Sequence, residues 1–236
     1  MAIVNGASSG IGLATARLFA DRDANVALVS RSLDKLKQLV KEIPGSKAFA
    51  ADITKTFEVK DMVKRVVSHF GRADILVNNT GQGYDAPAEK MDIEILRYIF
   101  ALSVVGPVVA MQAVIPLMRA QGGGAILNVS SGTALMHLPL NAAYSSLKRA
   151  LADISLIARE ELKNDNITVG IIYPYITTTN FEKRTIRYYP VKPGEEEPTG
   201  PQPPDTAEFV AGLIVRGIES GEAEIYAHDW MKQMNH

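Results

Sequence analysis

Short apolar segments alternate with longer amphipathic segments along most of the chain, and this alternation constrains the fold more than any other feature. The segment 56–70 shows the longer kind clearly, because its Val, Met and Phe residues recur at i, i+3, i+4 and i+7 and form one apolar stripe. Helices of this length can serve as crossovers between parallel strands. The sequence therefore predicts the α/β class, with a doubly wound parallel sheet of about seven strands and helices on both faces.

The expected elements form a single Rossmann-like domain over residues 1–236. The expected strands are 2–4, 25–30, 47–51, 74–78, 125–130, 167–173 and 224–226. The expected helices are 10–22, 33–43, 56–70, 89–120, 142–164 and 205–220. Thr54 or Thr56 is expected to cap the helix 56–70, and Gly71 is expected to end it. A chain of 236 residues without internal repeats suits one such domain.

One segment interrupts the alternation of strands and helices. Residues 187–204 hold six of the twelve prolines, and proline supports neither a helix interior nor a strand ladder. Ligands bind at the carboxyl edge of sheets of this kind, so the sequence predicts a lid loop near 180–204 that includes Phe181, Tyr188 and Tyr189. The alternative is an exposed and poorly ordered excursion.

Composition and charge argue against several classes of function. The formal net charge of −1 predicts no nucleic-acid partner and no polybasic membrane surface. The chain has no cysteine, which excludes disulfides, thiolate metal sites and thiol nucleophiles. No apolar run approaches the ~18 residues of a membrane span, and the residues after Met1 do not resemble a signal peptide. We therefore expect a soluble cytoplasmic protein that does not contact a membrane.

A glycine-rich turn follows the first expected strand and leads directly into the first expected helix. It reads Asn5-Gly6-Ala7-Ser8-Ser9-Gly10-Ile11-Gly12. Glycines in this position allow a tight turn and a close approach of the backbone to a pyrophosphate, whose charge is favoured at a helix N-terminus. The alternative is a tight strand-to-helix turn with no ligand. The context of strand, turn and helix favours a dinucleotide site.

Several motifs in the correct order make the chain resemble the short-chain dehydrogenase/reductase family. The turn resembles the family motif T-G-x-x-x-G-I-G, with Asn5 in the place of threonine, and N-N-T-G at 78–81 resembles N-N-A-G. Asp52 matches an acidic residue that contacts adenine in the family. The resemblance covers about residues 2–226. It implies a nicotinamide cofactor bound by Gly6, Ser8, Ser9, Gly10, Ile11, Gly12, Asp52, Ile53, Asn78, Thr80, Gly81, Pro174, Tyr175, Thr177 and Thr179.

The end of the second expected strand bears on the choice of cofactor. Enzymes that prefer NAD usually carry a carboxylate here, on the ribose 2′-hydroxyl. This chain has Ser30 and Arg31 instead. A guanidinium beside a small hydroxyl suits the 2′-phosphate of NADP, which a carboxylate would repel. The sequence therefore favours NADP(H) over NAD(H), the alternative for Arg31 being a solvated surface residue.

Tyr144 and Lys148 lie one helical turn apart on the same face of the helix 142–164. A phenol has a pKa of about 10, and a neighbouring ammonium and an oxidised nicotinamide are both expected to lower it toward the working range. Tyr144 then serves as a general acid or base for a carbonyl or an alcohol. The resemblance implies that Lys148 also binds the nicotinamide ribose. On their own, a tyrosine and a lysine at this spacing are unremarkable.

Ser131 precedes Tyr144 by thirteen residues, a spacing that matches the family serine whose hydroxyl hydrogen-bonds the substrate oxygen. Ser130 is adjacent, and we choose Ser131 because of the spacing. The alternative is an ordinary turn at 130–132. The resulting hypothesis is that a hydride passes between NADP(H) and a ketone, an aldehyde or a secondary alcohol.

Two positions depart from the family pattern. Ser103 stands where the family has an asparagine that holds a water in a proton relay to the lysine. Tyr175 follows Pro174 where the family has glycine, and we expect this bulky ring to lie close to the nicotinamide. These departures leave two rivals open: a catalytically impaired nucleotide-binding sensor or scaffold, and an isomerase or dehydratase on the same fold.

The remaining expectations concern metals and partners. The histidines at 69, 137, 228 and 236 show no metal-ligand spacing and no acidic companion, so we expect surface or packing roles and no metal. His137 is expected to border the substrate pocket. The helices 89–120 and 142–164 resemble those that build oligomers in the family, so a homodimer or homotetramer is expected by analogy.

Overall fold

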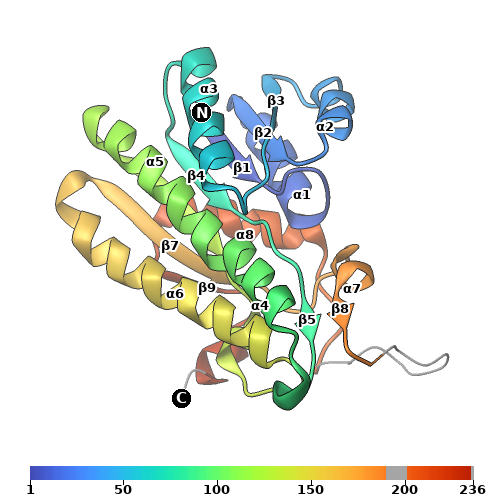
Figure 1. Cartoon of the computed structure of the whole chain (residues 1–236). Coiled ribbons are helices and arrows are strands. Elements are labelled where there is room, and N and C mark those ends of the chain that lie inside the picture. The colour runs from blue at the N-terminus through green and yellow to red at the C-terminus, as the bar shows by residue number, and fades with distance from the viewer. Residues whose placement is uncertain (190–200, 235–236) are drawn as a thin grey trace.

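The computed structural model describes residues 1–189 and 201–234, and its centre is a seven-stranded parallel sheet (Figure 1). The strand order is β3-β2-β1-β4-β6-β7-β9. The strands are β1 (Ala2–Asn5), β2 (Val26–Ser30), β3 (Ser46–Ala50), β4 (Ile75–Asn78), β6 (Gly124–Val129), β7 (Ile167–Tyr173) and β9 (Glu224–Tyr226). The predicted doubly wound α/β fold is therefore confirmed, with each expected strand present within one residue or two.

Helices cover both faces of the sheet (Figure 1). One face carries α1 (Gly10–Ala20), α2 (Leu33–Val40) and α8 (Ala207–Ser220). The other carries α3 (Thr56–Phe70), α5 (Gly106–Ala120) and α6 (Ala142–Leu162). The apolar stripe of α3 is buried as predicted, because Val59, Met62, Val63 and Val66 enter the core of this second face. Two hydrophobic layers thus enclose the sheet.

The ends of α3 test the capping predictions. Gly71 ends the helix in the left-handed region, with φ +77°, as expected. The N-cap prediction is wrong, because Lys55 occupies that position without a side-chain capping bond. Thr54 instead bonds Asp52: its backbone N–H and its hydroxyl donate to the Asp52 carboxylate at 2.9 and 2.8 Å.

The expected helix 89–120 is not one regular α-helix. A 3₁₀ turn (Ala88–Lys90) precedes α4 (Ile93–Phe100), and a π-helical turn (Ala101–Val105) joins α4 to α5. Asp92 fixes the start of α4, because its carboxylate accepts from Glu94 N and Ile95 N. Pro107 accounts for the π turn, since it has no N–H for the Ser103 carbonyl four residues earlier and its ring crowds that oxygen.

The helical stretch Ile93–Ala120 also corrects the expectation that no apolar run approaches the length of a membrane span. Its mean hydropathy reaches 2.0 over 18 residues, which is long and apolar enough to cross a membrane by length and composition. However, 56% of that window is buried inside the protein, against α3, α6 and the sheet. A core helix passes the same test, so this stretch is weak evidence for a membrane span.

A second, two-stranded sheet was not expected from the sequence. It pairs β5 (Tyr84–Asp85) with β8 (Ile186–Arg187), and β8 follows the short helix α7 (Phe181–Arg184). This pairing ties the first part of the expected lid to the segment after β4 (Figure 1). The rest of that lid, 190–200, lies outside the described residues.

A buried polar ladder crosses the sheet near its carboxyl edge. Asn5, Asn78 and Asn128 are partners in register on β1, β4 and β6. The Asn5 amide donates to Asn78 Oδ1 at 2.6 Å, Asn78 donates to Asn128 Oδ1 at 2.8 Å, and Asn128 donates to Ser155 Oγ at 2.8 Å. This row of bonded amides fixes the alignment of the strands, because a slip would break it; Asn5 Oδ1, at its end, has no hydrogen-bond partner among the described residues.

Candidate active site

Loops from four strands meet at the carboxyl edge of the sheet, and glycines mark where they touch. A Cβ atom built on Gly6 would lie 3.2 Å from the Thr80 backbone N. One on Gly10 would lie 3.1 Å from Thr179 Cγ2. The loops after β1, β4 and β7 are therefore in contact. The loop after β6 joins them, since a Cβ on Gly132 would lie 3.1 Å from Pro174 O.

The glycine turn after β1 has the shape expected of a phosphate cradle. Gly6 and Gly10 have φ +78° and +55°, which L side chains rarely adopt. At Gly12 a Cβ would lie 2.4 Å from Gly6 O, so the first turn of α1 presses on the turn before it. Ser8, Ser9 and Ile11 are partly exposed between these glycines. The N-terminus of an 11-residue helix here favours an anion.

Of the next three predicted cofactor contacts, Thr80 touches this cradle, Gly81 follows Thr80 in the chain, and Ile53 packs against Gly106 at the start of α5. Thr80 Oγ1 is buried and has no hydrogen-bond partner among the described residues, which fits a polar ligand. Ile53 is buried, and its side chain lies where a Cβ on Gly106 would be. Gly81 lies next to Lys148: a Cβ atom built on Gly81 would be 3.4 Å from Lys148 Nζ. Thr80 and Gly81 therefore fit a bound dinucleotide.

Two other predicted contacts are engaged elsewhere. Asn78 is 2% exposed, and its side chain belongs to the buried ladder, so its amide supports the sheet and does not face the cradle. Asp52 is half-buried, and its carboxylate bonds Thr54. Sequence spacing identifies a residue beside a site, but the direction of its side chain depends on neighbours that only the fold supplies.

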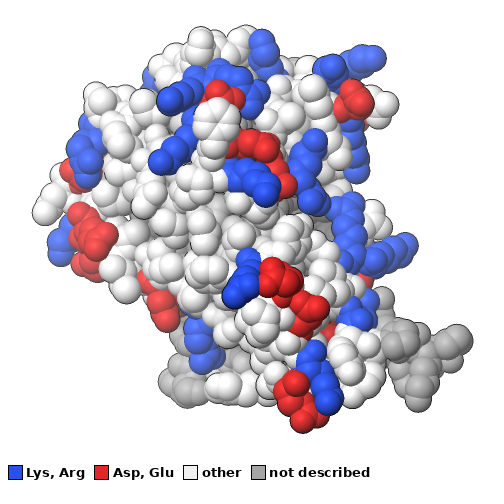
Figure 2. All heavy atoms as spheres, viewed as in Figure 1, with Lys and Arg blue, Asp and Glu red and all other residues white. Residues whose placement is uncertain are grey.

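Ser30 and Arg31 lie at the end of β2. The Ser30 hydroxyl accepts a hydrogen bond from Ser32 N at 3.2 Å. The Arg31 side chain is exposed, with one guanidinium N–H directed at the Tyr98 hydroxyl at 3.4 Å. Figure 2 shows lysine and arginine side chains gathered along the flank where α1, α2 and α7 lie. This edge of the cradle is therefore positively charged.

Tyr144 and Lys148, buried in the first turns of α6, form a cluster with the half-buried Ser131 of the turn after β6. Tyr144 is 8% exposed and Lys148 2% exposed. The Lys148 ammonium lies 5.7 Å from the centre of the Tyr144 ring and donates to Val129 O at 2.8 Å. The Ser131 hydroxyl accepts from Thr133 N and Thr133 Oγ1 at 3.2 and 3.0 Å. The three side chains singled out by spacing are brought together.

Burial dominates the protonation of this cluster. It raises the pKa of Tyr144 well above its usual range, although a hydrogen bond from Ser131 acts in the opposite direction. Burial also lowers the pKa of Lys148 to about 8. In the chain alone the effect of burial exceeds any lowering by Lys148, whose ammonium donates to Val129 O. The predicted lowering by the ammonium together with an oxidised nicotinamide stays a prediction. Tyr144 is held in the protonated form, which can donate a proton.

The structure separates the two adjacent serines. Ser130 is 3% exposed, and its hydroxyl donates to Lys148 O at 2.9 Å, which fastens β6 to α6. Ser131 begins the 3₁₀ turn Gly132–Leu135 and reaches Tyr144. Ser131 is therefore the serine that faces the phenol.

Ser103 lies in the π-helical turn Ala101–Val105, which packs against α6. The residue is fully buried, and Ser103 Oγ has no hydrogen-bond partner among the described residues. Unpartnered buried hydroxyls are rare, and π turns occur often at functional sites. Its position is thus consistent with a polar role beside α6.

The segment after β7 shows what holds the Tyr175 ring, whose expected closeness to the nicotinamide stays a prediction. Its ring packs edge-on against Trp230 at 5.6 Å, and its hydroxyl donates to Gln202 O at 3.0 Å. The bulk of Tyr175 is therefore held by C-terminal residues. Thr177 and Thr179 close local turns, since Thr177 Oγ1 donates to Tyr175 O and Thr179 Oγ1 accepts from Phe181 N.

His228 corrects the expectation that no histidine has an acidic companion. Its Nε2 lies 3.0 Å from both carboxylate oxygens of Asp205, and its ring stacks on Phe209 at 5.6 Å. The Asp205 backbone pairs with the segment after β7, because Asp205 N donates to Ile176 O and Thr178 N donates to Asp205 O, each at 2.8 Å. Asp205 and His228 are 23 residues apart in the sequence, so no local sequence pattern indicates that they pair. Their contact anchors the segment that holds Thr177 and Thr179.

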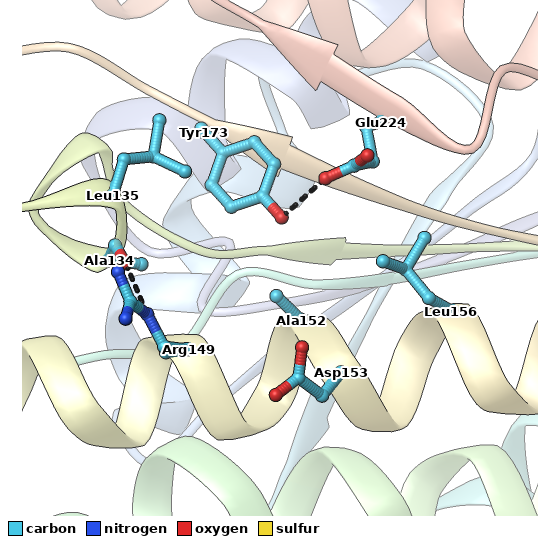
Figure 3. Close-up of a pocket in the computed structure, with 8 residues that line it drawn as sticks. All are labelled: Ala134, Leu135, Arg149, Ala152, Asp153, Leu156, Tyr173 and Glu224. Atoms are coloured by element: carbon cyan, nitrogen blue, oxygen red, sulfur yellow. Dashed lines mark hydrogen bonds between the residues drawn. The ribbon is translucent and has the colours of Figure 1, made fainter. Parts of the chain in front are cut away.

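A surface pocket of about 240 Å³ lies beside α6 (Figure 3). Two hydrogen bonds cross its walls, from Tyr173 Oη to Glu224 Oε1 at 2.9 Å and from Arg149 Nε to Ala134 O at 2.8 Å. Its lining residues are Ala134, Leu135, Arg149, Ala152, Asp153, Leu156, Tyr173 and Glu224. None of them belongs to the buried cluster or the cradle, so this pocket is distinct from the candidate active site.

Curated proteins similar to this chain are oxidoreductases. D-beta-hydroxybutyrate dehydrogenase of Rhizobium meliloti is 32% identical over 190 residues, which cover 78% of this chain and 74% of that protein. The 3-oxoacyl-[acyl-carrier-protein] reductase of Thermotoga maritima is 34% identical over 186 residues, which cover 77% of this chain and 76% of that protein.

Solved structures agree with the fold along nearly its whole length. A short-chain dehydrogenase from Streptomyces avermitilis superposes with a TM-score of 0.87 at 27% identity, covering 99% of this chain and 90% of that one. A 3-ketoacyl-(acyl-carrier-protein) reductase from Brucella melitensis complexed with NADH gives 0.85 at 25% identity, covering 95% of each chain. L-Sorbose reductase from Gluconobacter frateurii complexed with NADPH and L-sorbose gives 0.82 at 25% identity, covering 95% and 93%.

The family described as short chain dehydrogenase matches residues 1–188. These residues contain the glycine cradle and the cluster of Ser131, Tyr144 and Lys148. The chain therefore belongs to the short-chain dehydrogenase/reductase family of oxidoreductases.

Proposed function

We propose that this protein is an NADP(H)-dependent oxidoreductase that interconverts a carbonyl compound and a secondary alcohol. The observation that carries the proposal is the cluster of buried Tyr144 and Lys148 with half-buried Ser131, beside the glycine cradle. The proposed enzyme is cytoplasmic and forms a homodimer or homotetramer, on the analogy given by its long helices α5 and α6.

When bound, the reduced cofactor supplies a hydride, and with it two electrons, to the carbonyl carbon. The cradle of Gly6, Gly10 and Gly12 would hold its pyrophosphate, and Lys148 below Gly81 would hold the nicotinamide ribose. Two observations support the fit of the cofactor to these residues. The glycine turn has no room for a Cβ atom, and the buried hydroxyl of Thr80 has no hydrogen-bond partner among the described residues.

Tyr144 and Ser131 do the remaining chemistry on the substrate oxygen. The Ser131 hydroxyl orients and polarises the C=O group by a hydrogen bond. As the C=O π bond breaks, the Tyr144 hydroxyl gives its proton to that oxygen and an alcohol forms. The raised pKa of Tyr144 keeps this proton in place beforehand, which favours the role of general acid. Solvent then restores the proton to the phenolate.

The proposed preference for NADP(H) rests on Arg31. Relatives of known structure were solved with NADH and with NADPH, so the fold alone does not decide the cofactor. Arg31 is exposed at the end of β2, where it can pair with a 2′-phosphate. We expect Arg31→Ala to weaken NADPH binding by up to about 3 kcal/mol and to leave NADH binding nearly unchanged. Titration of both cofactors by fluorescence measures this, and Lys35→Ala on α2 is the control. Equal losses for both cofactors would show that Arg31 supports the fold.

Ser103 is proposed to take part in proton resupply to Tyr144. A serine hydroxyl is shorter than an asparagine amide and has fewer donors, so it holds a relay water less firmly. We expect Ser103→Asn to keep or modestly raise turnover and to reduce the solvent isotope effect. Steady-state rates in H₂O and D₂O measure this, with thermal unfolding as the check of folding. A variant that folds normally but is inactive would refute the relay role and assign Ser103 to packing in the π turn.

Turnover of a panel of ketones and aldehydes, followed by NADPH absorbance, tests the proposed function. An impaired sensor would bind NADPH without consuming it. An isomerase or dehydratase would form product with no net loss of NADPH. Consumption of NADPH with formation of the matching alcohol supports the proposal against both rivals.

A further inference from the structure

The segment after β7 contacts the glycine cradle, and the chain just before α8 holds it there. A Cβ atom built on Gly10 would lie 3.1 Å from Thr179 Cγ2, so the cradle and this segment touch. The Asp205 backbone pairs with the segment twice, since Asp205 N donates to Ile176 O and Thr178 N donates to Asp205 O, each at 2.8 Å. The place of this segment beside the cradle therefore depends on where Asp205 lies.

Asp205 is held in turn by His228, which follows β9. The His228 Nε2 atom lies 3.0 Å from both carboxylate oxygens of Asp205, and the two side chains are 20% and 10% exposed. The Gln202 side-chain amide meets the same ring nitrogen. An Nε2–H donates to a carboxylate whether the imidazole is neutral or charged, and such a bond is stronger where water is largely excluded. Without the imidazole, the Asp205 carboxylate would lose this donor in a mostly buried place.

Three aromatic rings hold the His228 imidazole in its orientation. The rings of Phe209 and Trp230 lie nearly parallel to it, with centroids 5.6 and 6.2 Å away. The Tyr175 ring packs edge-on against it at 5.7 Å. Tyr175 belongs to the segment after β7, so the imidazole contacts this segment directly as well as through Asp205. Packing of this kind restricts the imidazole to the orientation that reaches the carboxylate.

Met231 ties the same stretch of chain to the turn of Ser131. Met231 is buried, and its N–H donates to His228 O at 3.0 Å. Its side chain touches Gly132, because a Cβ built there would lie 2.8 Å from Met231 Cε. Gly132 follows Ser131 and donates to Pro174 O at 2.8 Å. The His228 ring therefore stands on a part of the chain that is packed against the candidate active site.

We infer that His228 and Asp205 are positioning residues, which fix the segment of Thr177 and Thr179 in the place where it binds the nicotinamide cofactor. This inference rests on the proposed function and adds two residues that act through the segment. A segment that is ordered before the cofactor arrives loses less conformational entropy on binding, so its support contributes to affinity. Breaking the pair is expected to weaken cofactor binding without altering a group that contacts the cofactor.

Titration with NADPH tests the inference in His228→Leu and His228→Gln. Leucine cannot donate, so we expect the Kd for NADPH to rise about tenfold, within the range for losing a hydrogen bond to a charged group. Glutamine keeps a side-chain N–H donor and should restore most of the affinity. Hydrogen exchange of the chain alone gives a second readout. The Thr178 amide, which donates to Asp205 O, should exchange faster in His228→Leu and near its normal rate in His228→Gln.

Arg159→Met is the matched control for a general loss of stability. Arg159 also joins distant parts of the chain, because it donates to Val169 O at 3.0 Å and to Gly221 O at 2.6 Å, but these residues belong neither to the cradle nor to the segment after β7. This control should unfold at a lower urea concentration and bind NADPH normally. If His228→Leu does not fold, Asp205→Asn takes its place. Asparagine keeps the size of the side chain but not its charge, and the Kd should rise about threefold.

The outcomes separate this inference from the proposed function. Weaker NADPH binding that glutamine restores supports the inference even where no ketone or aldehyde is reduced. Unchanged binding in the folded variant, a loss that glutamine does not restore, or an equal loss in Arg159→Met overturns the inference, while turnover by the unaltered protein would still support the proposed function. An unaltered protein that binds neither NADPH nor NADH would overturn both.

Discussion

Replacing Tyr144 with phenylalanine is expected to lower kcat for carbonyl reduction by about 10²-fold or more, as for the loss of a general acid. The change removes one hydroxyl from a ring that is 8% exposed and packed against Phe181. The ring remains, so the fold and the affinity for NADPH should be preserved. Steady-state kinetics measure the loss, and NADPH titration shows whether the cradle is intact.

Tyr173→Phe is a matched control for this experiment. Tyr173 is also a buried tyrosine, but its hydroxyl donates to Glu224 of β9, and both residues line the surface pocket, which none of Ser131, Tyr144 and Lys148 lines. Its loss should leave kcat near that of the unaltered protein. A Tyr144→Phe variant with near-normal turnover would remove Tyr144 from the mechanism and leave proton transfer to solvent or another residue.

The fold was predictable because its determinants are local. Apolar segments alternate with helices that carry one apolar stripe, and this pattern was enough to predict each strand of the large sheet. The stripe of α3 is buried, as its spacing indicates. The π turn also had a local cause in Gly106-Pro107, which follows Ser103 closely and blocks its normal hydrogen bond. That signal was present in the sequence and was missed.

The parts that were missed depend on contacts between distant segments. β5 and β8 have two residues each and lie about a hundred residues apart, too short for any periodic pattern. Asp205 and His228 carry no spacing that marks a pair. The rise of the Tyr144 pKa in the chain alone could not be predicted either, because it depends on burial and on nearby carboxylates that only the folded chain brings there.

Adding one methyl group at Gly12 is expected to cause the second large loss. The Cβ of alanine would lie 2.4 Å from Gly6 O and 2.6 Å from Asn79 Nδ2, distances at which something must shift. The nearest atom is backbone, so α1 and the turn have to separate. We expect Gly12→Ala to lower the free energy of unfolding by about 1–3 kcal/mol, as for overpacking, and to weaken NADPH binding at least tenfold. Urea unfolding and NADPH titration measure these effects.

Gly212→Ala distinguishes the cradle from a general effect of glycine in helices. Gly212 lies inside α8, and a Cβ built there meets no atom within 4 Å. Alanine stabilises a helix interior over glycine by about 0.5–1 kcal/mol, so this control should unfold at a higher urea concentration and bind NADPH normally. If Gly12→Ala were also stabilised and bound NADPH normally, the close approach at Gly12 would not be what shapes the turn. The affinity for the cofactor would then have to come from the residues near Thr80 and Lys148.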